Sequence, residues 1–364
     1  MPMKTDVAII GAGLAGLALA HSLHQSGHDV QIFEARGRPG GRIAALRTPL
    51  GNVDLGPPWF WPGQPRIAQL IATLGLQAFA QYASGEVSFE HSDGQVQRGV
   101  GYASMQGAYR LSGGMVTLVD ALVAQLPQAR LHLGCPVAGV SENGTVHLKN
   151  GTQCLAQHVV IALPPRLAAA SLAFHPSLPP SALQALAVIP TWMAGHAKFV
   201  AVYEQPFWRQ MGLSGDAISR CGPLAEIHDA SGPQATPAAL FGFLGIAASD
   251  RLGHADAIKA ASLAQLARIF GAQAAQPTVM ALQDWACEDY TAVIADHTPP
   301  RGHPAYGHPM ALTGLWGGRL HFAATETAEE MGGLMEGALL AANRVAREIA
   351  DAPRVERQHG LNHC

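Results

Sequence analysis

The stretch DVAIIGAGLAGLALAHSLHQSGHDVQIFEA, residues 6–35, decides the fold. It begins with a short apolar run at 6–10 that is rich in branched residues, as is typical of a buried parallel strand. Residues 11–27 have helical periodicity and end at Gly27, a residue type that is favoured just past a helix end. A second apolar run follows at 29–35. The stretch therefore predicts a strand, a tight turn, a helix and a parallel strand, which together form a βαβ unit.

The turn in this unit has the glycine spacing of a dinucleotide site. Gly11, Gly13 and Gly16 form G-x-G-x-x-G between strand and helix. The first glycine allows the tight turn, the second lets the backbone approach a pyrophosphate, and the third lets the helix pack on the strand. The helix N-terminus then attracts the phosphates. Glu34 ends the second strand, 18 residues after Gly16, where a carboxylate can accept ribose hydroxyls. On its own, Glu34 also fits a solvated strand end.

The same segment has an alternative interpretation as a secretory signal peptide. Lys4 precedes an apolar run at 7–20 that ends in LALA. Asp6 and the glycine spacing favour the binding motif instead. No apolar run in the chain approaches the ~20 residues of a membrane span, so we expect no contact with a membrane.

Composition excludes several classes of protein. Hydrophobic residues make up 48% of the 364 and charged residues only 13%, which excludes extensive disorder. The net charge of -3 gives no basic surface for nucleic acid. The five cysteines contain no C-x-x-C pair and their number is odd, so we expect no disulfide framework, no thiolate metal site and a reducing, cytoplasmic location. His359 and His363 beside Cys364 lie in a polar tail, where we predict no metal site.

The rest of the chain contains a segment of short strands, a segment of mixed helices and strands, and a C-terminal helix. Residues 131–163 predict short strands separated by Asn143-Gly144 and Asn150-Gly151, because Asn-Gly is a strong hairpin signal. Both asparagines also fit glycosylation acceptors, but a cytoplasmic chain favours turns. Residues 180–275 mix Ala-rich helices with strands and predict a second domain. Residues 332–350 predict an amphipathic helix, ended by Pro353.

The segment EARGRPGGR, residues 34–42, places a glycine pair beside arginines. Such a segment suits a second contact with a pyrophosphate. The backbone at the glycines can come close to the phosphates, and an arginine can bind them through two hydrogen bonds. It resembles the second flavin motif of the glutathione-reductase-type FAD proteins, specifically of the flavin-containing amine oxidase (monoamine oxidase-like) superfamily. The resemblance extends over nearly the whole chain, through DLGPPWFWPGQPRI (54–67), GCPVAGV (134–140), HVVIALPP (158–165), AKFVAVYEQPFW (197–208), DWACEDY (284–290) and LHFAATETAEEMGGLMEGALLAANRVAREI (320–349).

The resemblance implies roles for individual residues. Lys198 would hold a water against flavin N5 and assist the reaction with oxygen, and Trp285 would lie beside the flavin; these are the expected catalytic residues. Glu326 would bond the phosphate–ribityl region, and the helix near Leu334 and Met335 would direct its positive N-terminus at the flavin. Substrate contacts are expected from Trp59, Trp61 and Leu334. The motifs and the resemblance together predict FAD contacts by Gly11, Gly13, Leu14, Ala15, Gly16, Glu34, Ala35, Arg36, Gly40, Gly41, Arg42, Gly56, Pro57, Pro58, Trp59, Val137, Ala162, Leu163, Trp285, Tyr290, Thr325, Glu326, Leu334 and Met335.

The chain departs from the family pattern in three places. Ile294 occupies the position at which some members attach the flavin to a cysteine, so we expect non-covalent FAD. Ala295 and Leu334 replace the two aromatic residues that often frame the flavin and orient the amine. The segment before YRLSGGMVTLVDAL is short, so the substrate domain is reduced.

We therefore expect an α/β FAD-binding domain, Rossmann-like and of glutathione-reductase type, with a smaller α+β substrate domain. The FAD-binding domain would comprise 1–77, 107–187 and 288–352, the substrate domain 78–106 and 188–287, and the tail 353–364. The expected function is FAD-dependent oxidation of the C–N bond of a small organic substrate to an imine, by hydride removal, with reoxidation by oxygen or another acceptor. Two alternatives stay open: a desaturase or dehydrogenase of a non-amine substrate, and a non-catalytic binding protein of the same fold. A homodimer is also left open.

Overall fold

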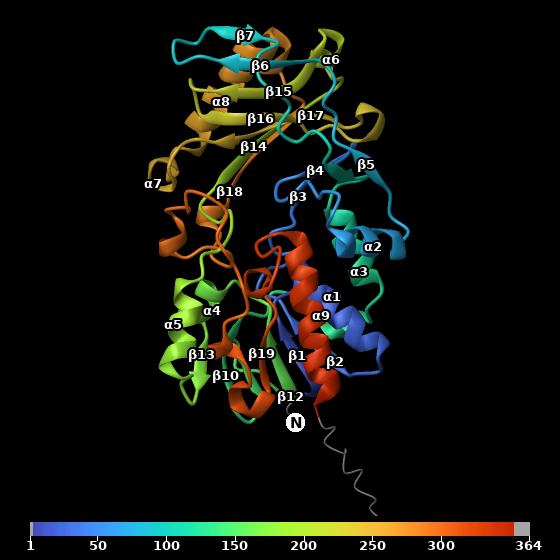
Figure 1. The fold of residues 1–364 in the computed structure, drawn as a ribbon, viewed down its shortest axis with the longest axis vertical. Coiled ribbons are helices and arrows are strands. Elements are labelled where there is room, and N and C mark those ends of the chain that lie inside the picture. Colours follow the sequence, from blue (N-terminus) through green and yellow to red (C-terminus); the bar gives the residue numbers. More distant parts are fainter. Residues whose placement is uncertain (1–2, 353–364) are drawn as a thin grey trace, which may run out of the picture.

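The computed structural model describes residues 3–352, which form two large sheets that follow one another along the long axis of the molecule (Figure 1). The sheet that contains the first strand lies at the end near the N-terminus, and the second sheet lies at the far end. The predicted tail 353–364, with His359, His363 and Cys364, lies outside the described residues.

The first sheet confirms the βαβ unit. Its strands run in the order β13-β10-β11-β12-β1-β2-β9, with β19 also paired to β12. Strand β1 is parallel to both of its neighbours, so Ile9 pairs with Ile32 on one side and with Val160 on the other. The strands are β1 (Met3–Ile10), β2 (Val30–Phe33), β9 (Leu131–His132), β10 (Val137–Ser141), β11 (Thr145–Leu148), β12 (Gln153–Ile161), β13 (Ala173–His175) and β19 (Leu320–Phe322).

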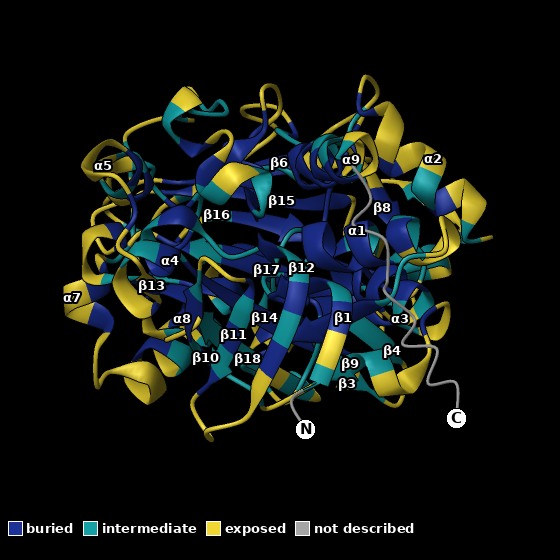
Figure 2. Ribbon diagram, turned by 90° about the horizontal axis from the view of Figure 1, so that it is seen from below, coloured by how far each residue is buried: buried dark blue, intermediate teal, exposed yellow. Residues whose placement is uncertain are grey.

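Both faces of this sheet are covered by helices, because both faces are apolar. Val7 and Ile9 of β1 join the core on one face, and Ala8 and Ile10 join the core on the other. Figure 2 shows β1 and β12 with buried and intermediate residues along most of their length, and most exposed residues lie at the periphery of the molecule. One face packs on α1 (Leu14–Gln25), α2 (Pro65–Thr73), α3 (Val116–Ala124) and α9 (Met335–Asp351), and the other on α4 (Pro165–Ser171) and α5 (Pro180–Val188).

The two Asn-Gly pairs form the predicted turns between β10, β11 and β12. Asn143 accepts a hydrogen bond from the Thr145 backbone N–H at 3.1 Å, and Asn150 accepts one from the Thr152 N–H at 2.9 Å. Gly144 and Gly151 have φ of +87° and +86°, in the left-handed region that glycine adopts without strain. The hairpin interpretation of these residues is confirmed.

The second sheet has the strand order β18-β14-β17-β16-β15-β6-β7 and is antiparallel except for the β15–β6 pair. Helix α8 (Ala255–Phe270) and the short α6 (Phe207–Gln210) pack on one face, and α7 (Ala248–Arg251) precedes α8. The other face turns toward the first sheet, and its Val200 and Phe241 pack with Trp59, from the segment after β4 (Gly51–Asp54), in a separate small core. The strands are β6 (Glu86–Glu90), β7 (Val96–Arg98), β14 (Ala197–Tyr203), β15 (Leu213–Ser219), β16 (Leu224–Asp229), β17 (Ala238–Leu244) and β18 (Val279–Asp284).

Two small hairpin-like pairs connect the sheets. Strand β3 (Ala45–Thr48) pairs with β4 (Gly51–Asp54), and β5 (Ala78–Ala80) pairs with β8 (Tyr109–Leu111). Figure 1 shows β3, β4 and β5 between the two large sheets, where the chain passes from one to the other. A doubly covered, mostly parallel sheet followed by a mixed sheet with helices on one face agrees with the predicted fold class.

Candidate active site

A cavity of about 780 Å³ connects the carboxyl ends of β1 and β2 with the inner face of the second sheet. It is lined by residues of both sheets, among them Gly11 of the first and Lys198 of the second. In open α/β sheets, ligands bind at this end of the strands. The predicted residues that line it are Gly11, Gly13, Leu14, Ala15, Glu34, Ala35, Arg36, Gly40, Gly41, Arg42, Gly56, Pro57, Pro58, Trp59, Trp61, Val137, Ala162, Leu163, Lys198, Trp285, Tyr290, Thr325, Leu334 and Met335.

The three glycines have the geometry that the dinucleotide pattern requires. Gly11 has φ +105°, and a Cβ there would lie 2.9 Å from the Ala162 carbonyl oxygen. A Cβ on Gly16 would lie 2.1 Å from the Gly11 carbonyl oxygen, so only glycine lets α1 approach β1 this closely. A Cβ on Gly13 would meet no protein atom within 4 Å. Gly13 therefore faces open space, where a ligand can contact the backbone.

Two helix N-termini face the same cavity. Helix α1 begins at Leu14, directly after Gly13, and α9 begins at Met335, directly after Leu334; all four residues line the cavity. The first N–H groups of a helix lack intrahelical partners and carry a partial positive charge. The cavity therefore offers two sites that favour negative charge, at the ends expected for the pyrophosphate and for the flavin.

Glu34 is buried and fixed at the end of β2. One carboxylate oxygen accepts a hydrogen bond from the Ala12 backbone N–H at 2.9 Å, and the other accepts from the Arg36 N–H at 2.9 Å. Each oxygen retains further acceptor capacity toward the cavity. The solvated strand end, which was the alternative for Glu34, does not fit a side chain that is 4% exposed.

The two ends of the segment 36–42 have different partners: one end faces the cavity, and the other is bonded to protein side chains. Gly40 and Gly41 have φ of +99° and +55°, and both line the cavity. Arg42 also lines it, and its guanidinium is held in a bidentate ion pair by Glu326, with N–O distances of 2.6 and 3.1 Å. Glu326 is completely buried and does not line the cavity, so its carboxylate serves Arg42. Arg36 is directed toward Glu288, at 3.0 Å, and Thr291, at 2.7 Å.

Lys198 lies on β14 and is 2% exposed. Its Nζ donates to the Gly56 carbonyl at 3.1 Å and lies 3.9 Å from the centre of the Phe241 ring. Burial lowers the pKa of Lys198 to about 7, opposed by the carboxylate of Asp54 and reinforced by Arg110. The same burial raises the pKa of Asp54. A lysine that changes charge near neutral pH at a cavity wall is a functional-site signal, because ordinary structural lysines stay charged.

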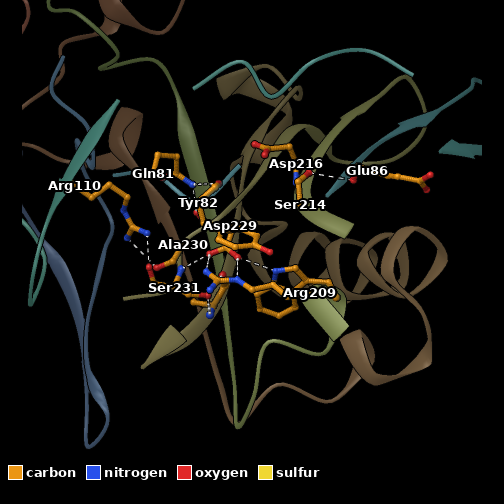
Figure 3. A network of polar contacts seen from close by, with 12 residues as sticks. Gln81, Tyr82, Glu86, Arg110, Arg209, Ser214, Asp216, Asp229, Ala230 and Ser231 are labelled. Atoms are coloured by element: carbon orange, nitrogen blue, oxygen red, sulfur yellow. Dashed lines mark hydrogen bonds and ion pairs between the residues drawn. The ribbon is translucent and has the colours of Figure 1, made fainter. Parts of the chain in front are cut away.

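A network of polar contacts surrounds Arg110 and Asp229 (Figure 3). Arg110 of β8 donates to the carbonyls of Ser231 at 2.7 Å and Ala230 at 2.9 Å. Asp229, at the end of β16, accepts from both Arg209, at 2.7 Å and 2.9 Å, and the Trp208 indole, at 2.8 Å. These contacts join β8 to the residues directly after β16 and join β16 to α6, and Arg110 also lies 4.0 Å from the Asp54 carboxylate.

Aromatic residues line the part of the cavity nearest the second sheet. Trp59 donates from its indole to Gln81 at 2.8 Å and packs against Phe241 and Phe243, with ring centres 5.3 and 6.4 Å apart. Trp285 is buried and donates to the Leu55 carbonyl at 3.3 Å. Trp59 and Trp285 thus have fixed rings, and both exclude water from this half of the cavity.

The departures from the family pattern have clear positions in the structure. Leu334 lines the cavity, whereas Ile294 and Ala295 do not, and Ile294 is 87% exposed. Cys135, Cys154, Cys221 and Cys287, the cysteines within residues 3–352, are free, and none lines the cavity. The described residues therefore offer no thiol for attachment of a ligand.

Several lining residues were not predicted from the sequence. They come from segments that are distant in the chain and share no motif: Lys149 beside the Asn150 turn, Trp192 and His196 before β14, Glu226 on β16, Phe243 on β17 and Asp289 after β18. The sequence alone carried no specific signal for these residues, because their place on the cavity wall depends on tertiary packing.

The Rossmann-like sheet, its glycines and the shared cavity define a dinucleotide-binding α/β protein. A sequence model of flavin containing amine oxidoreductases matches residues 100–350, and one of NAD(P)-binding Rossmann-like domains matches residues 9–74. The chain belongs to the flavin-containing amine oxidoreductase family.

Relatives and solved structures agree with this assignment. "Probable flavin-containing monoamine oxidase A" of Dictyostelium discoideum is 23% identical over 95% of this chain and 97% of its own length. Flavin-containing amine oxidase A of Sus scrofa is 25% identical over 95% of this chain and 85% of its own length. Cyclohexylamine oxidase from Brevibacterium oxydans has a similar fold, with a TM-score of 0.79, 22% identity and coverage of 95% of this chain and 98% of that one.

The alignment with the Dictyostelium protein is 451 positions long and exceeds the 364 residues here, so that relative carries segments which this chain lacks. In residues 3–352 no helix is long and apolar enough to cross a membrane, and no cluster of potential metal ligands occurs.

Membership of the family makes the protein an FAD-dependent oxidoreductase that oxidises the C–N bond of a small amine, with oxygen as acceptor. The residues of the cavity fit FAD, because Gly13 leaves the backbone open to a pyrophosphate and the two helix N-termini favour its negative charge. Among the described residues no cysteine lines the cavity, so the non-covalent FAD that the sequence predicts has no thiol beside it.

Proposed function

We propose that the cavity holds FAD from the glycines of the first sheet to Lys198 of the second, and that a small amine is oxidised against the inner face of the second sheet. The observation that supports this best is a single cavity lined by both Gly13 and Lys198. When bound, FAD supplies the hydride acceptor and passes the electrons to oxygen.

The predicted cofactor contacts divide between the two ends of the cavity. Glu34 accepts the hydroxyls of the adenosine ribose, Val137 contacts the adenine, and Arg42, oriented by Glu326, supplies a cation beside the pyrophosphate. Leu334 and Met335 present the α9 N-terminus to the opposite end. The support is their position on the cavity wall and the fixed geometry of the Arg42–Glu326 pair.

Lys198 and Trp285 act on the reacting groups in this proposal. Because the pKa of Lys198 is about 7, its Nζ can both hold and release a proton near neutral pH. The Gly56 carbonyl and the Phe241 ring fix the position of that nitrogen. Trp59, Trp61 and Trp285 form apolar walls that keep water from the reacting carbon.

We also propose the division into two domains as the sequence predicts it. All strands of the second sheet come from the ranges 78–106 and 188–287. The cytoplasmic location and the homodimer remain predictions of the sequence.

The products test the proposal directly. Each primary amine with a CH2–N carbon that is consumed in the presence of oxygen should yield one aldehyde, one ammonium ion and one hydrogen peroxide, since the imine hydrolyses in water. A desaturase or dehydrogenase would leave ammonium unformed, and a non-catalytic binding protein would leave the amine intact.

A further inference from the structure

Glu226 is an acidic residue in the part of the cavity formed by the second sheet. Within residues 3–352 the cavity is lined by three carboxylates, Glu34, Asp289 and Glu226. Glu34 lies at the end of β2, and Asp289 follows β18 next to Tyr290 and the Arg36 partners. Only Glu226 is on a strand of the second sheet, and the cofactor contacts predicted from the sequence do not use it.

The sheet register places Glu226 on the same face as Lys198. Lys198 of β14 pairs with Phe243 of β17, and Phe243 pairs with Glu226 of β16. Directly paired residues in neighbouring strands project to the same face, and neighbouring strands lie about 4.8 Å apart. Lys198 and Glu226 are therefore about 10 Å apart along this row, and all three side chains line the cavity.

The Glu226 carboxylate is held from behind in one orientation. Its Oε1 accepts a hydrogen bond from the Ser104 hydroxyl at 2.8 Å and lies 3.0 Å from His228 Nε2, although this second contact is not aligned as a hydrogen bond. His228 Nδ1 in turn lies 2.6 Å from Asp216 Oδ1. His228 and Asp216 are both buried, whereas the Glu226 side chain is one-third exposed to the cavity, at 33%.

Of the three titratable residues in this group, Glu226 is the one that lines the cavity. The contact with His228 lowers the pKa of Glu226, against the effect of its partial burial. Burial would lower the pKa of His228, but the two carboxylates outweigh it and the pKa is raised. Burial raises the pKa of Asp216, and Glu226 is the acidic side chain that this group directs at the cavity. The surrounding wall includes Trp59, Phe243 and Met105, whose faces suit an alkylammonium group.

We propose that Glu226, positioned by His228 and Asp216, binds a second ammonium group of the substrate, so that the preferred substrates are diamines or longer polyamines. This rests on the proposed function, because the other amine of the same molecule is oxidised at the Lys198 end of the row. The distal ammonium keeps its proton and its bonds throughout, and it serves only to place the reacting carbon.

The reductive half-reaction of the FAD-loaded enzyme tests this subsite without oxygen. Anaerobic stopped-flow mixing with 1,4-diaminobutane and with 1-aminobutane gives an apparent Kd and a limiting rate of flavin reduction for each amine. We expect the parent to bind the diamine at least tenfold more tightly, and Glu226→Gln to reduce that preference by at least tenfold, the scale of one partly buried charge-assisted contact. Glu226→Asp should retain part of the preference. Glu204→Gln, on an exposed carboxylate just after β14, is the matched control and should leave it unchanged.

His228→Gln tests the positioning role. It should raise the Kd for the diamine several-fold more than the Kd for the monoamine, whereas a merely structural histidine would change both alike. If the parent binds both amines equally and Glu226→Gln changes nothing, the subsite is overturned while amine oxidation stands. If no amine reduces the bound flavin, the proposed function and the subsite are overturned together.

Discussion

Lys198→Met removes a buried ammonium while it keeps an unbranched stem of similar length, so it isolates the effect of the charge. The ordinary pKa of a lysine is 10.5, and burial lowers that of Lys198 to about 7. Between these two pH values the unfolded chain binds a proton on this lysine that the folded chain has released. The free energy of unfolding of the parent therefore rises with pH in this window, by about 1.4 kcal/mol per pH unit.

Lys198→Met has no titratable group at this position, so the difference in the free energy of unfolding between parent and variant gives the contribution of Lys198. From pH 7 to about two units above it, the free energy of unfolding of the parent should rise by about 2–3 kcal/mol relative to Lys198→Met. Below pH 7, where both states of the parent are protonated, the charge destabilises the folded protein by about 5 kcal/mol, and this penalty disappears as the pH approaches 10.5.

Urea unfolding of the FAD-saturated proteins at a series of pH values measures the difference. Lys4→Met, at an exposed position, is the control and should give a profile parallel to that of the parent. A direct measurement is also available, because the chain has only four lysines, Lys4, Lys149, Lys198 and Lys259. In [ε-¹³C]lysine-labelled protein, one resonance should titrate near pH 7 and vanish in Lys198→Met. Parallel unfolding profiles for parent and variant, with all four resonances titrating near their ordinary value, would refute the reasoning.

The remaining predictions concern the cofactor, oxygen and stability. Glu34→Ala should raise the Kd for FAD at least tenfold, measured by fluorescence titration of the apoprotein, since charge-assisted bonds to a ribose contribute about 1.5–3 kcal/mol; an unchanged Kd would remove Glu34 from the site. Acid precipitation should release all flavin to the supernatant, and colour retained in the washed pellet would contradict non-covalent binding. Lys198→Met should slow reoxidation of the reduced flavin by oxygen roughly ten- to a hundredfold, or about 1.4–2.7 kcal/mol in the barrier; reoxidation at the parent rate would make Lys198 structural. Asp229→Ala should destabilise the protein by about 3–5 kcal/mol, because it leaves the partly buried Arg209 and the buried Trp208 donors without their acceptor; a change below about 1 kcal/mol in urea unfolding would show that water replaces the carboxylate.

The first sheet was predictable because its signals are local. The strand at β1, the turn at Gly11 and the helix α1 follow one another within a single stretch, and the Asn143 and Asn150 turns mark the later strands. The resemblance also assigned Lys198 to the flavin, and Lys198 lines the cavity.

The wall made by the second sheet was not predictable in the same way. Glu226 and Phe243 meet Lys198 only through the register of β14, β17 and β16, which no local pattern specifies. The resemblance assigned Glu326 to the cofactor, but its carboxylate turns to Arg42, a residue 284 positions away in the chain. Such long-range ion pairs depend on tertiary packing and carry no spacing signal.

The most direct test of the central claim is anaerobic bleaching of the purified yellow protein. Mixed with a panel of amines, amino acids and non-amine metabolites, the bound flavin should lose its colour with amines alone and regain it when oxygen is admitted. Flavin that stays oxidised with every amine, or that is bleached by a non-amine metabolite instead, would contradict the assignment of this cavity to amine oxidation.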